Sequence, residues 1–227
     1  MIKALYTAAS GMVAQSTKQD VIAHNIANAQ TPGFKRKRTV EASFQQALEK
    51  TVSVMETGKR PPFTIQPVLA HAEAADDTSD GSVHSTANPL NFAIEGAGTF
   101  EIGSGATARQ TRNGSFVVDK DGELATPDGD KVQGKNGAIQ MPKGEWNVTT
   151  DGTIVTAKGN QIDQIKITDA EPGKTHIMQG YLEDSNVSII REMVDMIANL
   201  RSYEANQRVV SSVDGTLDKL INEAGRV

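Results

Sequence analysis

Residues 187–214, VSIIREMVDMIANLRSYEANQRVVSSVD, contain neither glycine nor proline, and they decide the fold of this 227-residue chain. As a single helix they extend about 42 Å at 1.5 Å per residue, which is longer than a small domain needs. Ser185 and Asn186 precede the stretch, and both are suitable N-cap residues. The sequence therefore predicts one long helix towards its C-terminal end.

The apolar residues of this predicted helix cover a wide arc of its surface. One heptad line is apolar throughout and comprises Ile189, Met196, Tyr203, Val210 and Leu217. The residues that widen this line are Met193, Leu200, Val213 and Leu220, and a further flank is formed by Ile190, Val194 and Ile197. A helix that is apolar over so wide an arc must be covered from more than one direction.

A second helix is predicted at the N-terminal end, from Lys3 to about Asn28. Its apolar stripe is thin and consists of Leu5, Met12, Ile22 and Ile26. Small alanines and Gly11 accompany the stripe, which suggests that another helix approaches closely. The helix is expected to end before Thr31-Pro32-Gly33, because proline fixes φ and glycine tolerates the positive φ that a type II turn requires.

The middle of the chain has a different pattern. Val40, Phe44, Leu48 and Met55 suggest a shorter helix up to Thr57, although Val52 and Val54 alternate as in a strand. Residues 58–89 are rich in proline and small polar residues, which is typical of a linker or a mobile loop. Residues 90–182 contain short apolar runs separated by turn dipeptides, which predicts β-hairpins; these dipeptides include Asn113-Gly114, Asp121-Gly122, Asn136-Gly137 and Asp151-Gly152.

An internal repeat lies within the β-rich region. Residues 121–126, DGELAT, return 30 positions later as residues 151–156, DGTIVT, so two similar hairpin units are the simplest interpretation. We therefore predict an α+β protein in four parts: an N-terminal helical segment (1–57), a linker (58–89), a β-rich domain (90–182) and a C-terminal helix (183–227). The two terminal helices are expected to pair in a coiled-coil-like domain, into which the β-rich domain is inserted.

Composition and motifs exclude several classes of protein. The net charge of −5 argues against nucleic acid as a partner, and the absence of cysteine excludes thiolate metal sites and cysteine nucleophiles. No two histidines have the i, i+4 spacing of helical metal ligands, and Gly173-Lys174-Thr175 lacks the first glycine of a P-loop. We therefore expect no catalytic residues, no cofactor and no metal ion, and we predict that the protein is not an enzyme. No apolar run is long enough for membrane insertion, and no secretory signal is evident.

One basic cluster, Lys35-Arg36-Lys37-Arg38, leaves two alternatives open. It is suited to contact phosphate or lipid, but a short solvated run after a helix is the simpler interpretation.

The two terminal helices lead to a functional hypothesis. The simplest way to bury them is against each other, but the C-terminal arc is wider than the thin N-terminal stripe covers, and apolar patches of that size mark protein interfaces. A head-to-tail contact between copies propagates into a ring or a filament, so we predict a self-assembling structural protein. The alternative is an ordinary helical hairpin packed on its own β domain. The residues predicted at the subunit interface are Leu5, Met12, Ile22, Ile26, Ile189, Met193, Met196, Ile197, Leu200, Tyr203 and Val210.

Three parts of the chain resemble bacterial flagellar rod and hook proteins. Residues 25–35, NIANAQTPGFK, are similar to the N-terminal signature of that family, and residues 182–187, LEDSNV, followed by RSYEAN at 201–206, to its C-terminal signature. Residues 88–96, NPLNFAIEG, and 111–116, TRNGSF, resemble the family's central segments. The residues that carry the terminal signatures are Asn25, Asn28, Thr31, Pro32, Gly33, Phe34, Leu182, Glu183, Ser185, Asn186 and Val187.

This resemblance implies a fold, partners and a location. In the family the terminal segments form an inner coiled-coil-like domain that lines a tubular axial polymer, and the β domain faces outward. The implied partners are further copies of the chain in a helical polymer, other rod and hook subunits, and the flagellar type III export apparatus. The implied location is the periplasmic basal body, reached without a cleavable signal peptide.

Within the family, the central β domain resembles that of the proximal or distal rod subunits. Residues 20–25, 34–36 and 179–183 favour the distal type, although Thr99 stands where members usually carry an aromatic residue and the chain is short between Ile167 and His176. The alternative function is a periplasmic carbohydrate-binding or wall-degrading accessory protein that uses the β-rich domain. It requires carboxylates or aromatic residues that converge in a cleft, and Trp146, the single tryptophan, does not supply them alone.

Overall fold

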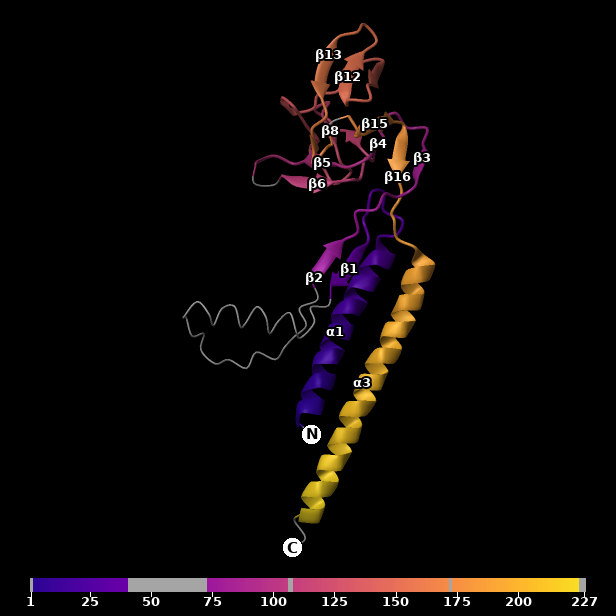
Figure 1. Ribbon diagram of the computed structural model, residues 1–227. Helices are drawn as coiled ribbons and strands as arrows, with labels where there is room; N and C mark the ends of the chain where they lie inside the picture. The colour runs from indigo at the N-terminus through magenta and orange to yellow at the C-terminus, as the bar shows by residue number, and fades with distance from the viewer. Residues whose placement is uncertain (1, 41–72, 106–107, 172, 225–227) are drawn as a thin grey trace. The chain divides into compact units, whose positions relative to one another are not determined.

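The computed structural model describes residues 2–40, 73–105, 108–171 and 173–224 (Figure 1). The chain folds into two compact units. The helical unit comprises Met1–Ala27, Lys37–Asp77 and Ser188–Val227, and the β unit comprises Asn28–Arg36 and Thr78–Val187. Helices at both ends and a β-rich middle confirm the predicted α+β class.

The helical unit contains the two long helices α1 (Ile2–Ala27) and α3 (Ile189–Ala224). They lie side by side and pack against each other (Figure 1). The same unit holds the antiparallel pair β1 (Lys37–Val40) and β2 (Glu73–Asp76). Helix α1 lies within one residue of the bounds predicted from its periodicity.

Helix α3 differs from the prediction at its N-terminal end. At its C-terminal end it continues through Gly215 to Ala224, in line with the predicted range of 183–227, because a glycine costs a helix only about 1 kcal/mol and 36 helical residues tolerate that cost. It begins after Ser188, so neither Ser185 nor Asn186 is its N-cap, and the side chains of both accept backbone N–H groups outside the helix. The Ser188 carbonyl accepts the first helical hydrogen bond, from the Glu192 N–H at 3.0 Å.

Between the terminal helices and the hairpins, the sequence predicts a short helix and a linker. The predicted helix up to Thr57 lies, beyond Val40, outside the described residues, and Val40 itself belongs to β1. Within the predicted linker, residues 73–76 form β2 and residues 83–85 form β3. These strands escaped prediction because they lack apolar alternation: the three residues of β3 are all exposed, and backbone pairing with β16 holds them.

The β unit consists of short antiparallel strands. In chain order they are β3 (Val83–Ser85), β4 (Phe92–Glu95), β5 (Thr99–Ile102), β6 (Arg109–Thr111), β7 (Val117–Val118), β8 (Leu124–Ala125), β9 (Gln133–Gly134), β10 (Gly137–Ala138), β11 (Trp146–Val148), β12 (Thr153–Thr156), β13 (Gln161–Gln164), β14 (Ile167–Thr168), β15 (His176–Gln179) and β16 (Tyr181–Glu183). The first strands pair with the last: β3 with β16, β4 with β15, and β5 with β14. This long-range pairing closes the unit.

One hydrophobic core holds these strands together. Phe92, Phe100 and Phe116 are fully buried at its centre, and the rings of Phe100 and Phe116 meet edge to face with centroids 5.2 Å apart. The aliphatic residues around them are Ile94, Ile102, Leu124, Val132, Ile139, Ile154, Ile165 and Ile177. The core is thus mainly aliphatic, with three phenylalanine rings at its centre.

The 30-residue periodicity of the sequence appears again in the turns. The N–H of Asp119 bonds to the Glu123 carbonyl at 2.8 Å, and the N–H of Thr149 bonds to the Thr153 carbonyl at 2.9 Å. The glycines of both turns, Gly122 and Gly152, have positive φ values of 80° and 81°. The two copies therefore share a backbone conformation as well as a sequence pattern.

Asn113-Gly114 is not the hairpin turn that its sequence predicts. The Gly114 carbonyl accepts the N–H of Phe92 at 3.0 Å, and a Cβ atom on Gly114 would lie 1.7 Å from the Phe92 carbonyl oxygen. The glycine is required here because two backbones approach closely, whereas a positive φ plays no part. By contrast, Gly137 has a φ of 117° between β9 and β10, as expected of a hairpin turn.

The boundaries of the units also differ from the predicted ones. Residues 28–36, assigned above to the N-terminal helical segment, and residues 183–187, assigned to the C-terminal helix, both belong to the β unit. The cause is a set of hydrogen bonds within the β unit that joins residues 33–36 to Glu183 and Asn186.

We predict that Gly114→Ala lowers the free energy of unfolding of the β unit by about 2–3 kcal/mol or more, because neither backbone has room to move. Chemical denaturation followed by the fluorescence of Trp146 measures this change. The control is Gly129→Ala, where φ is +93° but the space around the glycine is open, and where about 1 kcal/mol is expected. Equal effects of the two substitutions would contradict the close-approach explanation.

Candidate assembly surface

Helices α1 and α3 run antiparallel and are joined by polar side chains. Asn25 donates to Glu192 at 3.2 Å, and the amide of Asn199 donates to the Gln15 carbonyl at 2.8 Å and to the Gln19 side chain at 2.9 Å. Both Asn25 and Glu192 have 1% exposure, and Asn199 has 4%. Buried amides and carboxylates are stable only where they are hydrogen-bonded, so these contacts favour one register of the two helices.

Gly11 permits close approach on the same side. A Cβ atom at this position would lie 3.0 Å from the amide nitrogen of Asn206. The small residues of α1 had suggested a neighbouring helix, and at Gly11 that neighbour is α3.

Asn25 also fixes the strand that follows α1 in the helical unit. Its side-chain oxygen accepts the N–H of Lys37 at 2.9 Å, and its amide donates to the Lys37 carbonyl at 2.9 Å. The side chain thus pairs with the backbone of Lys37 as a neighbouring strand would, at the first residue of β1. This contact gives a physical role to an asparagine of the N-terminal signature.

We call the polar line of Glu192, Asn199 and Asn206 on α3 the polar seam. Its members are seven residues apart, so they share one side of the helix, and that side contacts α1. Apolar periodicity does not reveal this seam, because all three of its members are polar. The neighbouring predicted line contributes half-buried side chains at Ile189, Met196, Val210 and Leu217, whereas Tyr203 is 38% exposed.

We call Ile190, Met193, Val194, Ile197 and Leu200 the apolar stripe of α3. Their exposed fractions are 79%, 50%, 61%, 54% and 46%, respectively. Their spacing of three and four residues places them on a continuous side of the helix, away from the polar seam. Three of the predicted interface residues, Met193, Ile197 and Leu200, therefore lie on this exposed side.

The remaining predicted interface residues lie closer to the contact between the helices. On α1, Ile22 is 5% exposed, and Leu5, Met12 and Ile26 are half-buried. The predicted set thus combines two groups that the structure separates: side chains covered within the chain, and the exposed side chains of the apolar stripe.

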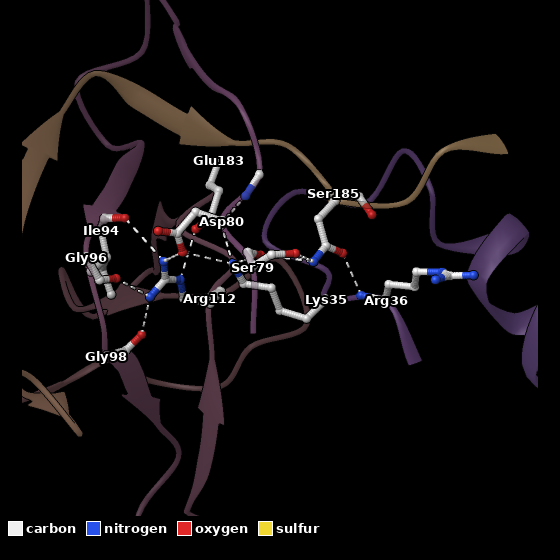
Figure 2. Close-up of polar contacts among 12 residues, drawn as sticks. Lys35, Arg36, Ser79, Asp80, Ile94, Gly96, Gly98, Arg112, Glu183 and Ser185 are labelled. Atoms are coloured by element: carbon white, nitrogen blue, oxygen red, sulfur yellow. Dashed lines mark hydrogen bonds and ion pairs between the residues drawn. The ribbon is translucent and has the colours of Figure 1, made fainter. Parts of the chain in front are cut away.

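A second polar cluster lies in the β unit, around the buried carboxylate of Glu183 (Figure 2). Lys35 binds Glu183 at 2.7 Å and Arg112 binds it at 2.9 Å, and the side chain of Glu183 is 2% exposed. The N–H of Gly81 donates to the same carboxylate at 3.0 Å. Asp80 completes the charge balance, with contacts of 3.3 Å to Lys35 and 3.0 Å to Arg112.

Arg112 is held from several directions. Its guanidinium donates to the carbonyls of Gly96 at 2.8 Å and Gly98 at 2.7 Å, in addition to both carboxylates (Figure 2). Gly96 and Gly98 have positive φ values and offer their carbonyl oxygens to this cation. The carboxylate and carbonyl partners of Arg112 stabilise its buried positive charge, so this residue has a structural role in the β unit.

Asn186 ties the same segments together. Its side-chain oxygen accepts the N–H of Arg36 at 2.6 Å, and its amide donates to the Ser79 carbonyl at 2.9 Å. The backbone of Gly33 donates to the Glu183 carbonyl at 2.7 Å. We call these connected residues the clasp: Gly33, Lys35, Arg36, Ser79, Asp80, Gly81, Arg112, Glu183 and Asn186.

The clasp explains the turn between α1 and β1. Gly33 has a φ of 68°, and the N–H of Phe34 bonds to the Thr31 carbonyl at 3.2 Å, as predicted for a type II turn at Thr31-Pro32-Gly33. The N–H of Thr31 bonds to the Asn28 carbonyl at 3.1 Å. A Cβ atom on Gly33 would lie 2.3 Å from the backbone of Arg112, so this glycine also permits contact with the β unit.

The remaining signature residues and the basic cluster have structural positions as well. Leu182 is buried, and the Ser185 hydroxyl accepts the N–H of Val187. The simpler interpretation of the basic cluster as a solvated run is wrong for Lys35, whose ammonium binds the buried carboxylate of Glu183. Arg38 forms an ion pair with Asp77, but its side chain is 60% exposed, as that interpretation predicts.

Metal sites, an exposed tryptophan and membrane-spanning helices were also sought among the described residues. Among them, no group of three or more histidine, aspartate or glutamate side chains is placed to hold a metal ion. Trp146 is half-buried and packs on Phe92 with ring centroids 6.3 Å apart, so it lies at the edge of the hydrophobic core. Within the same residues, none of the helices has the length and apolarity to cross a membrane.

We predict that Glu183→Gln lowers the free energy of unfolding of the β unit by about 3 kcal/mol, because two cations lose the charge of their buried partner. Urea denaturation measures this loss of free energy of unfolding. The matched control is Asp130→Asn, which removes a carboxylate from its ion pair with the largely exposed Arg109, and less than about 1 kcal/mol is expected there. A loss at Glu183 no larger than at Asp130 would show that the clasp contributes no more than a surface ion pair.

A second prediction concerns the helical unit. Asn25→Leu removes the partner of Glu192 and of both backbone groups of Lys37, and should lower the stability of the α1–α3 pair by about 2–4 kcal/mol. Hydrogen exchange of the α1 amides reports this change. Asn222→Leu, at an exposed position of α3, is the control, and exchange as slow as in the parent chain after Asn25→Leu would contradict the assigned role.

Comparison with known proteins matches both ends and the middle of the chain. Residues 5–35 match the family model described as flagella basal body rod protein, residues 93–145 match the flagellar hook protein FlgE/F/G D1 domain, and residues 178–223 match the flagellar basal body rod FlgEFG protein C-terminal. These ranges include the signature residues at Asn28–Phe34 and Leu182–Val187.

Similar proteins cover almost the whole chain. Flagellar basal-body rod protein FlgG of Bacillus subtilis is 30% identical, over 98% of this chain and 99% of its own length. FlgG of Caulobacter vibrioides and FlgF of Rhizobium meliloti are each 31% identical, over 95% and 97% of this chain and 97% of their own lengths. The alignment with the Bacillus protein spans 267 positions against the 227 residues here, so that relative contains 40 or more positions that this chain lacks.

These relatives are structural proteins of the flagellum and not enzymes. The family models occur in the order expected for rod proteins, and the relatives extend over both terminal helices and the β unit. The chain therefore belongs to the flagellar basal-body rod protein family.

Proposed function

We propose that this chain is a structural subunit of the flagellar rod that polymerises through α1 and α3 into a tubular axial structure and transmits torque. The partners are further copies of the chain and other rod and hook subunits. In this proposal the helices line the tube as a coiled-coil-like inner domain, and the β unit forms the outer part of each subunit.

The observation that carries this proposal is the apolar stripe of α3. Ile190, Val194 and Ile197 are each more than half exposed, although they are large aliphatic side chains on a well-formed helix. Exposed apolar side chains that adjoin one another mark protein interfaces. Since α1 contacts the polar seam of the same helix, the stripe remains available to another copy.

The proposal includes an open polymer. We propose that the stripe packs on a different surface of the next copy, which makes the contact heterologous. Heterologous contacts repeat from copy to copy, and they produce a ring or a helical filament. A rod is such a filament.

We propose that the chain is a rod subunit of the distal type. The proximal type is the second candidate. The support is the similarity of residues 20–25, 34–36 and 179–183 to the distal type. We further propose assembly in the periplasm after passage through the flagellar type III export apparatus, as the family membership suggests.

The test is Ile197→Asp, which places a charge within the stripe. We expect loss of incorporation into the polymer and loss of motility in a strain that carries this variant, because burial of an unpaired carboxylate at an interface is unfavourable. Sedimentation of the purified chain and motility plates measure the two effects.

The matched control is Ser202→Asp, which adds the same charge at another exposed position of α3, away from the stripe. The urea denaturation profile of the β unit should be unchanged in both variants. Normal assembly of the Ile197 variant, or equal loss in both, would refute the assignment of the stripe as the interface.

A further inference from the structure

The clasp joins segments that are far apart in the sequence at the points where the chain enters and leaves the β unit. The chain passes between the units after residues 27, 36, 77 and 187. Lys35 and Arg36 lie at the second of these points, Ser79 and Asp80 at the third, and Glu183 and Asn186 near the fourth. The clasp therefore holds three of the four connecting segments to one another.

Several of its contacts resist separation of the two segments that continue into the terminal helices. The segment after α1 is bound to the segment before α3 by the Gly33–Glu183 backbone bond at 2.7 Å, the Lys35–Glu183 ion pair at 2.7 Å and the Arg36–Asn186 bond at 2.6 Å. A force that pulls α1 and α3 apart at the β unit loads these bonds, together with the Asn25–Glu192 contact within the helical unit. The bonds of the clasp are closely spaced, so they share the force.

The clasp is also anchored in the body of the β unit. Arg112 connects Glu183 to the carbonyls of Gly96 and Gly98, which lie between β4 and β5, and β5 contributes Phe100 to the core. Figure 2 shows this line of contacts from the carbonyl groups through Arg112 to Glu183 and Lys35. Tension on the connecting segments thus reaches the core through side chains, in addition to the two-stranded pair β3–β16.

Without the clasp, that strand pair is a weak point. Strands β3 and β16 have three residues each and are joined to each other by a single antiparallel ladder. Since β16 continues towards α3, a pull on α3 acts along this short ladder. A two-stranded pair has little stability of its own.

We infer that the clasp is a mechanical clamp, which keeps the β unit folded when force enters it through α1 and α3. The inference rests on the proposed function, because torque in a rod is the source of such a force. Glu183 is the centre of the clamp, and Lys35, Arg112 and Asn186 are its positioning residues.

The experiment is force spectroscopy on single full-length chains. Since the parent chain contains no cysteine, Ala27→Cys and Ser188→Cys provide attachment points at the borders of the β unit. In this pulling geometry we expect Lys35→Met and Asn186→Ala each to raise the rate of unfolding at constant force by about tenfold or more, the factor that 1.4 kcal/mol of lost barrier gives.

A second pulling geometry separates a clamp from a general stabiliser. Lys120→Cys and Lys158→Cys attach the handles to two exposed positions in the repeated hairpins, away from the clasp. There, Lys35→Met and Asn186→Ala should raise the unfolding rate by a clearly smaller factor than in the first geometry, because the handles do not load the clasp directly. Arg109→Ala, which removes an ion pair elsewhere in the β unit, should change the rate little in either geometry.

Rescue by Lys35→Arg, which retains the positive charge, should restore slow unfolding in the first geometry. An equal rise in both geometries, or no rise in the first, would overturn the inference. Because single unassembled chains are measured, this result is independent of whether the apolar stripe forms the polymer contact. Failure of the Ile197→Asp test would refute the proposed interface and leave the clamp measurement unaffected.

Discussion

The β unit depends on one buried carboxylate. Glu183 has almost no contact with water, so its charge is tolerated only because Lys35, Arg112 and the N–H of Gly81 all point at it. These partners come from three separate parts of the chain, and none of them reaches Glu183 unless its own segment is correctly placed. One charge therefore fixes the turn after α1, the segment before β3 and the strand that leads to α3. The glycines around it have a matching role, since a Cβ atom at Gly33 or Gly81 would collide with backbone.

Some parts of this fold were predictable from the sequence and others were not, because they differ in the sequence pattern that they leave. Helix α1 and the body of α3 were predictable because long apolar periodicity survives in sequence, and the turn at Gly33 because proline followed by glycine has a specific conformational meaning. Strands β2 and β3 were not predictable, since they are held by backbone pairing and carry no apolar alternation. The start of α3 was misplaced because Ser185 and Asn186 are suitable N-caps by residue type, and only the structure shows that their side chains bind backbone N–H groups outside the helix.

The charged and polar contacts left the weakest signal. Glu183, Lys35 and Arg112 are ordinary surface residue types, and nothing in their local sequence shows that three distant segments bury them together. Resemblance to the rod family did select Glu183, Asn25 and Asn186 as signature residues, but it supplied no physical role for them. The structure assigns Asn25 to the α1–α3 contact and Asn186 and Glu183 to the clasp. Residues of the family signatures thus stabilise both units: Asn25 the helical unit, and Glu183 and Asn186 the β unit.

Helix α3 shows that apolar periodicity alone does not separate contacts within the chain from an exposed apolar surface. The predicted interface residues include side chains of both kinds: α1 contacts the side of α3 that carries Glu192 and Asn199, and the stripe from Ile190 to Leu200 is exposed. The two kinds of surface have different physical properties. Apolar burial is non-directional and tolerates many arrangements, whereas buried amides and carboxylates are satisfied in few. Polar contacts within the chain therefore select one register for α1 and α3, and that register determines where the apolar stripe is presented to other molecules.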